Sequence, residues 1–167
     1  MEVVIRPVIN GQYQAIKTDA VSCTYDMEVL TPMSAVLSQL GLDHEHFRKC
    51  AYMHAGEKFR VISHGDEKPL VITTTKTERW ESEPNATEQI LNTADAERCE
   101  SLCMTHFAFI VGAFPVAAFM QCLQQVEQAR NQTQLKRVVV DVDERHLGVA
   151  NTAYMQVKVE VAELGKQ

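Results

Sequence analysis

The chain has 167 residues, enough for one domain with a substantial core, so we expect a single domain over residues 1–167. Its formal net charge of −6 excludes the basic surface of a general nucleic-acid-binding protein. The sequence begins MEVVIRPVI, without the pattern of a signal peptide, and no apolar run is long enough to span a membrane. We therefore expect a soluble cytoplasmic protein with no membrane partner.

The first half of the chain is predicted to form four strands and two helices. The strands have β-branched residues at apolar positions and turn residues at their ends; they cover residues 2–9, 14–24, 56–64 and 69–75. The helices have apolar residues at helical spacing behind residues that suit a helix start; they cover residues 31–41 and 43–53.

The second half is predicted to alternate between helices and strands. Asn85 and Glu88 form a capping box that opens a helix through about Cys103. Continuous apolar runs predict buried strands at 106–112 and 137–142, and a helix begins at Pro115 between them. At the end, the alternation in residues 154–161 (YMQVKVEV) favours a strand, although a terminal helix remains an alternative.

This alternation predicts an α/β fold: a three-layer sandwich with a mixed, mostly parallel central sheet and helices on both faces. We expect Val21, Phe109, Val139 and Val140 to be buried in that sheet. Right-handed crossovers would bring the carboxyl ends of the strands to one rim, where ligands bind in open α/β sheets.

No metal site or cofactor is predicted. The 5 cysteines include no C-x-x-C pair and are expected to be reduced thiols. The histidines and carboxylates at 43–46 are one or two residues apart and do not share a helix face. Neither this segment nor His146 supplies the four convergent ligands of structural zinc.

Two segments carry a more specific pattern. Gly11-Gln12-Tyr13-Gln14 is followed without a gap by Asp19-Ala20-Val21, and the run HFAFIVGAFP precedes a helix and RVVVDVD. In this order they resemble the macrodomains, which bind ADP-ribose through a Gly-Asp-Ile-Thr turn, an Asp-Ala-hydrophobic strand and a phosphate loop. The resemblance implies a macrodomain-like fold and a pocket for ADP-ribose or another adenine nucleotide.

The resemblance also implies a set of ligand-binding residues at the strand ends: Gln12, Cys23, Asp26, Gly112, Ala113, Phe114 and Asp143. Several depart from the family. Gln12 replaces the aspartate that holds the adenine amino group, Cys23 and Asp26 replace paired asparagines, and the second phosphate loop keeps one glycine, Gly112. Charge repulsion from Asp26 is expected to weaken a diphosphate ligand by about a hundredfold.

Three functions remain open from the sequence. The first is a divergent module that binds ADP-ribose or a related nucleotide weakly, with its phosphate at Gly112 and Ala113. The second is a protein-interaction module that has lost its ligand site. The third is an ADP-ribosyl hydrolase, or an enzyme that uses Cys23 or Asp26, but no spacing identifies a catalytic pair and the catalytic residues stay unknown.

Overall fold

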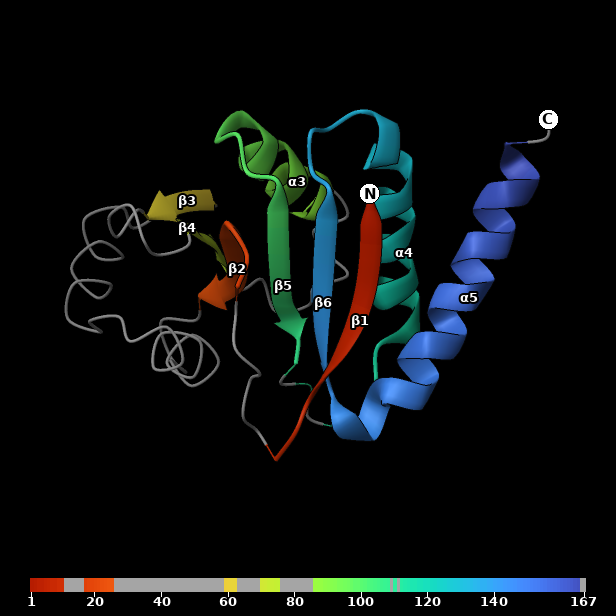
Figure 1. Cartoon of the computed structure of the whole chain (residues 1–167). Helices are drawn as coiled ribbons and strands as arrows, with labels where there is room; N and C mark the ends of the chain where they lie inside the picture. The colour runs from red at the N-terminus through yellow and green to blue at the C-terminus, as the bar shows by residue number, and fades with distance from the viewer. Residues whose placement is uncertain are drawn as a thin grey trace.

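The structure is a computed structural model that describes residues 1–10, 17–25, 59–62, 70–75, 86–108, 110 and 112–165. Its described residues form a six-stranded sheet with the order β1-β6-β5-β2-β4-β3 (Figure 1). The strands are β1 (Glu2–Val8), β2 (Ala20–Tyr25), β3 (Phe59–Ile62), β4 (Leu70–Thr75), β5 (Ser101–Phe107) and β6 (Arg137–Asp143). Only β3 runs antiparallel to its neighbour, β4, so the predicted mixed, mostly parallel sheet is confirmed.

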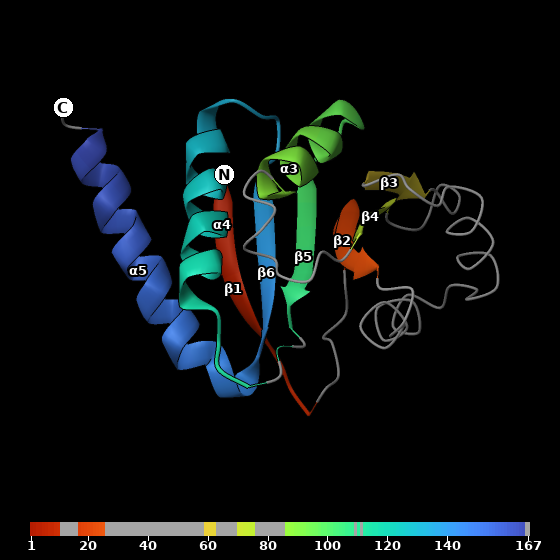
Figure 2. The ribbon, with the colours of Figure 1, turned by 180° about the vertical axis from the view of Figure 1, so that it is seen from behind.

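Three described helices accompany the sheet: α3 (Ala86–Ala96), α4 (Val116–Gln128) and α5 (Leu147–Leu164). Figures 1 and 2 show α3 and α4 on the same face of the sheet, and α5 beside α4 near the β1 edge. Short 3-10 turns follow α4 at Ala129–Asn131 and precede α5 at Glu144–His146. The helices predicted at 31–41 and 43–53 lie outside the described residues.

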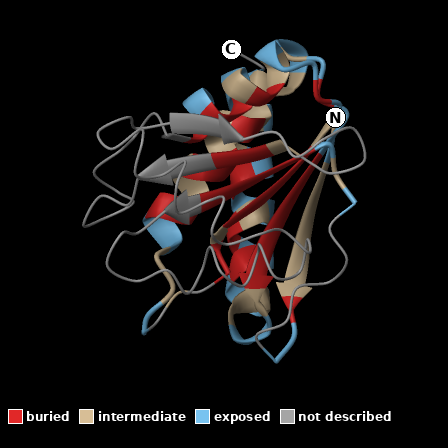
Figure 3. Ribbon diagram, turned by 90° about the vertical axis from the view of Figure 1, so that its left-hand side faces the viewer, coloured by how far each residue is buried: buried red, intermediate tan, exposed pale blue. Residues whose placement is uncertain are grey.

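Both faces of the sheet are buried, as the predicted sandwich requires (Figure 3). Toward the helices, the strands contribute Leu102, Met104, Val138, Val140 and Val142 to one apolar cluster. Side chains alternate between faces along a strand, and on the other face Val21 is 0% and Val139 1% exposed. The predicted burial of Val21, Val139 and Val140 is therefore confirmed, while Phe109 lies outside the described residues.

The boundary between α3 and β5 differs from the prediction. The helix ends at Ala96 and not near Cys103, and the strand covers Ser101–Phe107 in place of 106–112. Polar residues inside this strand obscured its bounds in the sequence, because a strand buried on both faces is expected to be apolar throughout. They are tolerated because Thr105 Oγ1 donates to the carbonyl of Ser22 at 2.8 Å and His106 Nε2 lies 3.1 Å from Ser22 Oγ.

The final element is a helix, α5, so the strand favoured for residues 154–161 is wrong. The buried positions are Ala150, Ala153 and Val157, which follow helical spacing. Two apolar residues that suggested alternation, Met155 and Val159, are instead 65% and 58% exposed. Small alanines on the buried face made the helical period hard to see. None of the helices described here is long and apolar enough to cross a membrane.

Candidate functional site

One distinctive stretch of backbone at the carboxyl ends of the strands is the loop of residues 112–115, between β5 and α4. Gly112 has φ +88°, which L side chains rarely adopt, and a Cβ added there would meet nothing within 4 Å. Gly112 and Ala113 are both exposed. The loop therefore presents open backbone at the rim where ligands bind in α/β folds.

This loop leads directly into the N-terminus of α4. Pro115 occupies the N-cap position and makes no side-chain cap hydrogen bond to the helix. The first N–H groups of an α-helix have no partner within the helix, and the helix dipole adds positive potential there. Such an end, approached through an exposed glycine, favours binding of a phosphate group.

Phe114 anchors the loop and is half-buried. Its ring centroid lies 5.0 Å from that of Phe119 and 6.2 Å from that of Phe107, both of which belong to the core. On another side it lies 5.2 Å from the ring of His146, the N-cap residue of α5. Phe114 thus joins the loop to the core and to the first turn of α5.

Asp143, at the end of β6, is engaged within its own turn. Its Oδ1 accepts hydrogen bonds of 2.9 Å from both the backbone N–H and Nε of Arg145, and Oδ2 accepts one of 3.1 Å from Nη2. These bonds from Arg145 hold the pKa of Asp143 below its usual value. Asp143 therefore caps the 3-10 turn, and its charge is balanced locally.

Cys23 is buried and 1% exposed, and burial raises the pKa of its thiol to about 12. A thiol needs a lowered pKa and access to act as a nucleophile. Burial also lowers the pKa of His106 to about 3, which keeps that ring neutral. Cys23 offers a ligand no exposed atom, and we leave it out of the proposed site. Gln12 and Asp26 lie outside the described residues.

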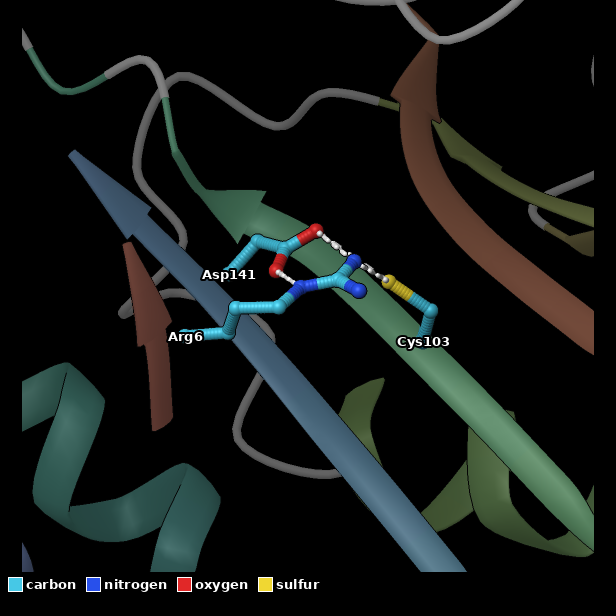
Figure 4. A network of polar contacts seen from close by, with 3 residues as sticks. All are labelled: Arg6, Cys103 and Asp141. Atoms are coloured by element: carbon cyan, nitrogen blue, oxygen red, sulfur yellow. Dashed lines mark hydrogen bonds and ion pairs between the residues drawn. The ribbon is translucent and has the colours of Figure 1, made fainter. Parts of the chain in front are cut away.

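A separate polar cluster lies on the sheet face away from α3 and α4 (Figure 4). Arg6 on β1 donates from Nε to Asp141 Oδ1 at 2.8 Å and from Nη2 to Oδ2 at 3.0 Å. Cys103 on β5 donates to the same Oδ2 at 3.2 Å. The carboxylate is 1% exposed and its partners are neighbouring strands, so the cluster joins β1, β6 and β5 and presents no open site.

Sequence reasoning missed the part of the rim between β6 and α5. His146 was considered only as a metal ligand, yet its ring contacts the candidate loop. The backbone N–H of Asn10, after β1, lies 3.4 Å from Glu144 Oε1, which brings the end of β1 to the same turn. The parallel pairing of β1 with β6 brings these residues together, and no local sequence pattern marks that pairing.

No protein-family model matches the sequence, and neither does any curated protein sequence. Solved structures do match. The macro domain of ganglioside induced differentiation associated protein 2 aligns with a TM-score of 0.64 at 14% identity, over 93% of this chain and 82% of that one. The chain has the macrodomain fold.

Two further structures with this fold give similar alignments. An Oceanobacillus iheyensis macrodomain with MES bound matches with a TM-score of 0.63 at 13% identity, covering 96% of this chain and 91% of its own. A Trypanosoma brucei macrodomain in complex with ADP-ribose matches with a TM-score of 0.63 at 11% identity, covering 93% and 68%. The suspected macrodomain resemblance is thus confirmed for the fold.

Proposed function

We propose that this protein binds a phosphate-bearing adenine nucleotide of the ADP-ribose class at the carboxyl ends of its parallel strands. The main support is the exposed Gly112, in a conformation suited to glycine, three residues before the N-cap Pro115 of α4. This arrangement offers backbone N–H groups and the positive end of a helix dipole to a phosphate.

The charges near the loop are mixed, with Asp143 and Glu144 negative and Arg145 positive. Asp143 carries a negative charge, but the guanidinium of Arg145 binds it through two side-chain hydrogen bonds. Residues 112–116 contain no acidic side chain. The Trypanosoma brucei macrodomain was solved with ADP and with ADP-ribose, which supports a ligand of this chemistry for the same fold.

The departures at Gln12, Cys23 and Asp26 lead us to propose weak binding. Asp26 would place a negative charge near a diphosphate, and Asp26→Asn is expected to increase the affinity for ADP-ribose. The buried thiol of Cys23 gives no support to a cysteine-dependent enzyme. We therefore propose nucleotide binding in preference to cysteine-dependent catalysis.

A thermal-shift screen with ADP-ribose, ADP, AMP, NAD and adenosine tests the proposal. A ligand at ~100 times its dissociation constant adds about 2.7 kcal/mol to the stability of the folded state. Gly112→Val should abolish the shift, because valine is strained at φ +88° and would cover the loop. Gly165→Val is the matched control, since Gly165 lies at the C-terminus of α5 with φ −68° and an added Cβ would make only ordinary contacts at 3.6 Å. No shift with any phosphate-bearing ligand would refute the proposal.

A second candidate, binding to another protein, is favoured by a different surface. Val149, Met155, Val159 and Leu164 of α5 are all exposed. An open hollow of about 460 Å³ is lined by Val149 and other residues of α5 and by Val116 of α4. Exposed apolar surface of this kind marks interaction sites. Sedimentation velocity over a range of concentrations would detect self-association, which Val159→Glu should abolish.

A further inference from the structure

The outer face of α5 is not covered by any element among the described residues. Figures 1 and 2 show α5 at the edge of the molecule, beside α4. Its buried residues, Ala150, Ala153 and Val157, belong to the core cluster and lie on one side of the helix. On the opposite side, Met155 and Val159 are 65% and 58% exposed. Neighbouring apolar side chains exposed on one helix face indicate a contact surface.

The middle of this outer face has the repeat of a helix pair. Its residues are separated by four, three, four and three positions, and all of them are exposed: Gly148, Thr152, Met155, Val159 and Ala162. We call them the α5 row. This spacing is that of the a and d positions at which two helices meet in a coiled coil. None of the residues in the row carries a charge, so the row has the pattern of a helix–helix interface.

Thr152 adds a hydroxyl to the row, and that hydroxyl already has a partner. Its Oγ1 donates to the carbonyl of Gly148 at 3.0 Å, within the same helix. Packing against a second helix would therefore leave no unpaired donor. Thr152 and Val159 both fall at a positions, and β-branched side chains there favour two parallel helices. The row thus suits a second helix that runs in the same direction.

The charges beside the row also specify this direction. Lys158 lies on one flank at a g position, and Glu163 lies on the other flank at an e position; both are exposed. Two parallel helices place each g residue near the e residue five positions later in the partner, so Lys158 would meet Glu163 of a second copy. Antiparallel helices would place each flank against the same flank of the partner, and the Lys158 flank of α5 has no acidic residue.

We propose that the protein forms a two-fold symmetric dimer, in which α5 packs in parallel and in register against α5 of a second copy. The proposal rests on the second candidate function given above, for which it names the partner, and it does not depend on nucleotide binding. A helix of 18 residues is about 27 Å long, so the contact is small for a specific interface. The dimer should therefore dissociate on dilution.

Charge reversal tests the pairing of Lys158 with Glu163. Lys158→Glu and Glu163→Lys each replace two attractive contacts with repulsive ones, so each should weaken the dimer about tenfold. Sedimentation velocity over a range of concentrations measures the change. The double variant has opposite charges again and should dimerise like the wild type. Lys158→Glu also removes the contact of Nζ with the Tyr154 ring, at 4.7 Å, but recovery in the double variant would exclude this loss as the cause.

Ala162→Cys tests the direction of the pair. Parallel helices bring residue 162 of the two copies together, so mild oxidation should yield a dimer linked by a disulfide. Leu164→Cys is the matched control, because it lies in the same last turn, is exposed, and falls outside the α5 row. It should give little cross-linked dimer. The wild type under the same oxidation shows how much the native cysteines contribute.

Three results would overturn the parallel dimer: a wild type that stays monomeric at every concentration, a double variant that dimerises no better than the single variants, and equal cross-linking of the two cysteine variants. Nucleotide binding would stand in each case, because the thermal shift with ADP-ribose depends on the loop at Gly112. Dimerisation without any shift from a phosphate-bearing ligand would instead refute nucleotide binding alone.

Discussion

Arg6 and Asp141 form a two-bond ion pair between adjacent parallel strands, with Nε–Oδ1 at 2.8 Å and Nη2–Oδ2 at 3.0 Å. The side chain of Asp141 is 1% exposed and that of Arg6 is 19% exposed. The pairing with Asp141 raises the pKa of Arg6 above its usual value. This ion pair therefore joins the edge strand β1 to β6, whose carboxyl end lies at the candidate site.

Asp141→Asn should destabilise the protein by about 3 kcal/mol, because it removes the buried carboxylate that accepts both bonds from the Arg6 guanidinium. Urea unfolding followed by circular dichroism measures the change. Glu100→Gln is the control, since Glu100 pairs with Lys136 on the surface with both side chains well exposed. Glu100→Gln should lower the free energy of unfolding by about 0.5 kcal/mol or less. Equal effects of the two substitutions would contradict the proposed contribution of the buried pair.

The thiol of Cys23 should be inert in the folded protein. With a pKa raised to about 12 by burial, only about one molecule in ten thousand carries the thiolate at pH 8. Iodoacetamide at pH 8 should leave Cys23 unmodified in native protein and alkylate it in urea, as peptide mass spectrometry can show. Rapid alkylation of Cys23 in the native state would restore the cysteine-dependent enzyme as a candidate.

Glu127 links α4 to α5 and should make stability depend on acid pH. Its Oε1 accepts a bond of 3.0 Å from the Tyr154 hydroxyl, and hydrogen bonds from Arg130 lower the pKa of the carboxyl below 4.5. A lowered carboxyl pKa contributes stability above the unfolded value, and this contribution is lost as pH falls through the folded value. Glu127→Gln should therefore destabilise the protein at pH 7 and much less at pH 3.

Urea unfolding at the two pH values measures this effect, with Glu163→Gln as an exposed control on α5. The control should have little effect at either pH. If Glu127→Gln costs the same at pH 3 as at pH 7, its hydrogen bonds do not depend on the ionised carboxylate.

His106 should make the protein less stable as pH falls below 6.5. Burial lowers the pKa of His106 from 6.5 to about 3, so in this window the unfolded chain binds a proton that the folded chain does not. The resulting decrease in the free energy of unfolding reaches about 2 kcal/mol at pH 5. The His106→Gln variant should lose less stability than the wild type between pH 7 and pH 5. If the stability of both proteins falls equally with pH, the ring of His106 is not kept neutral in the folded state.

The sequence predicted the sheet well, because strands buried on both faces have long apolar runs. RVVVDV, for example, marked β6 directly, although its aspartate is the fully buried Asp141. Prediction failed where burial depends on small or polar residues. Two of the three buried residues of α5 are alanines, and paired polar groups inside β5 displaced its expected boundary.

The candidate site could be predicted only in part, since a ligand rim is built from segments far apart in sequence. Gly112 and Ala113 stood out because a glycine preceded a helix start. His146 did not, because its contact with Phe114 depends on how the first turn of α5 meets the loop before α4. The burial of Cys23 likewise depends on tertiary structure and has no local signal.

A nuclear magnetic resonance titration of ¹⁵N-labelled protein with ADP tests most directly where the nucleotide binds. Adenosine at the same concentrations serves as the phosphate-free comparison. We expect ADP to shift the backbone amide signals of Gly112, Ala113 and the first turn of α4 more than any others in the described residues, and more than adenosine does. Absence of shifts at millimolar ADP, or shifts confined to the exposed face of α5, would contradict nucleotide binding at this loop.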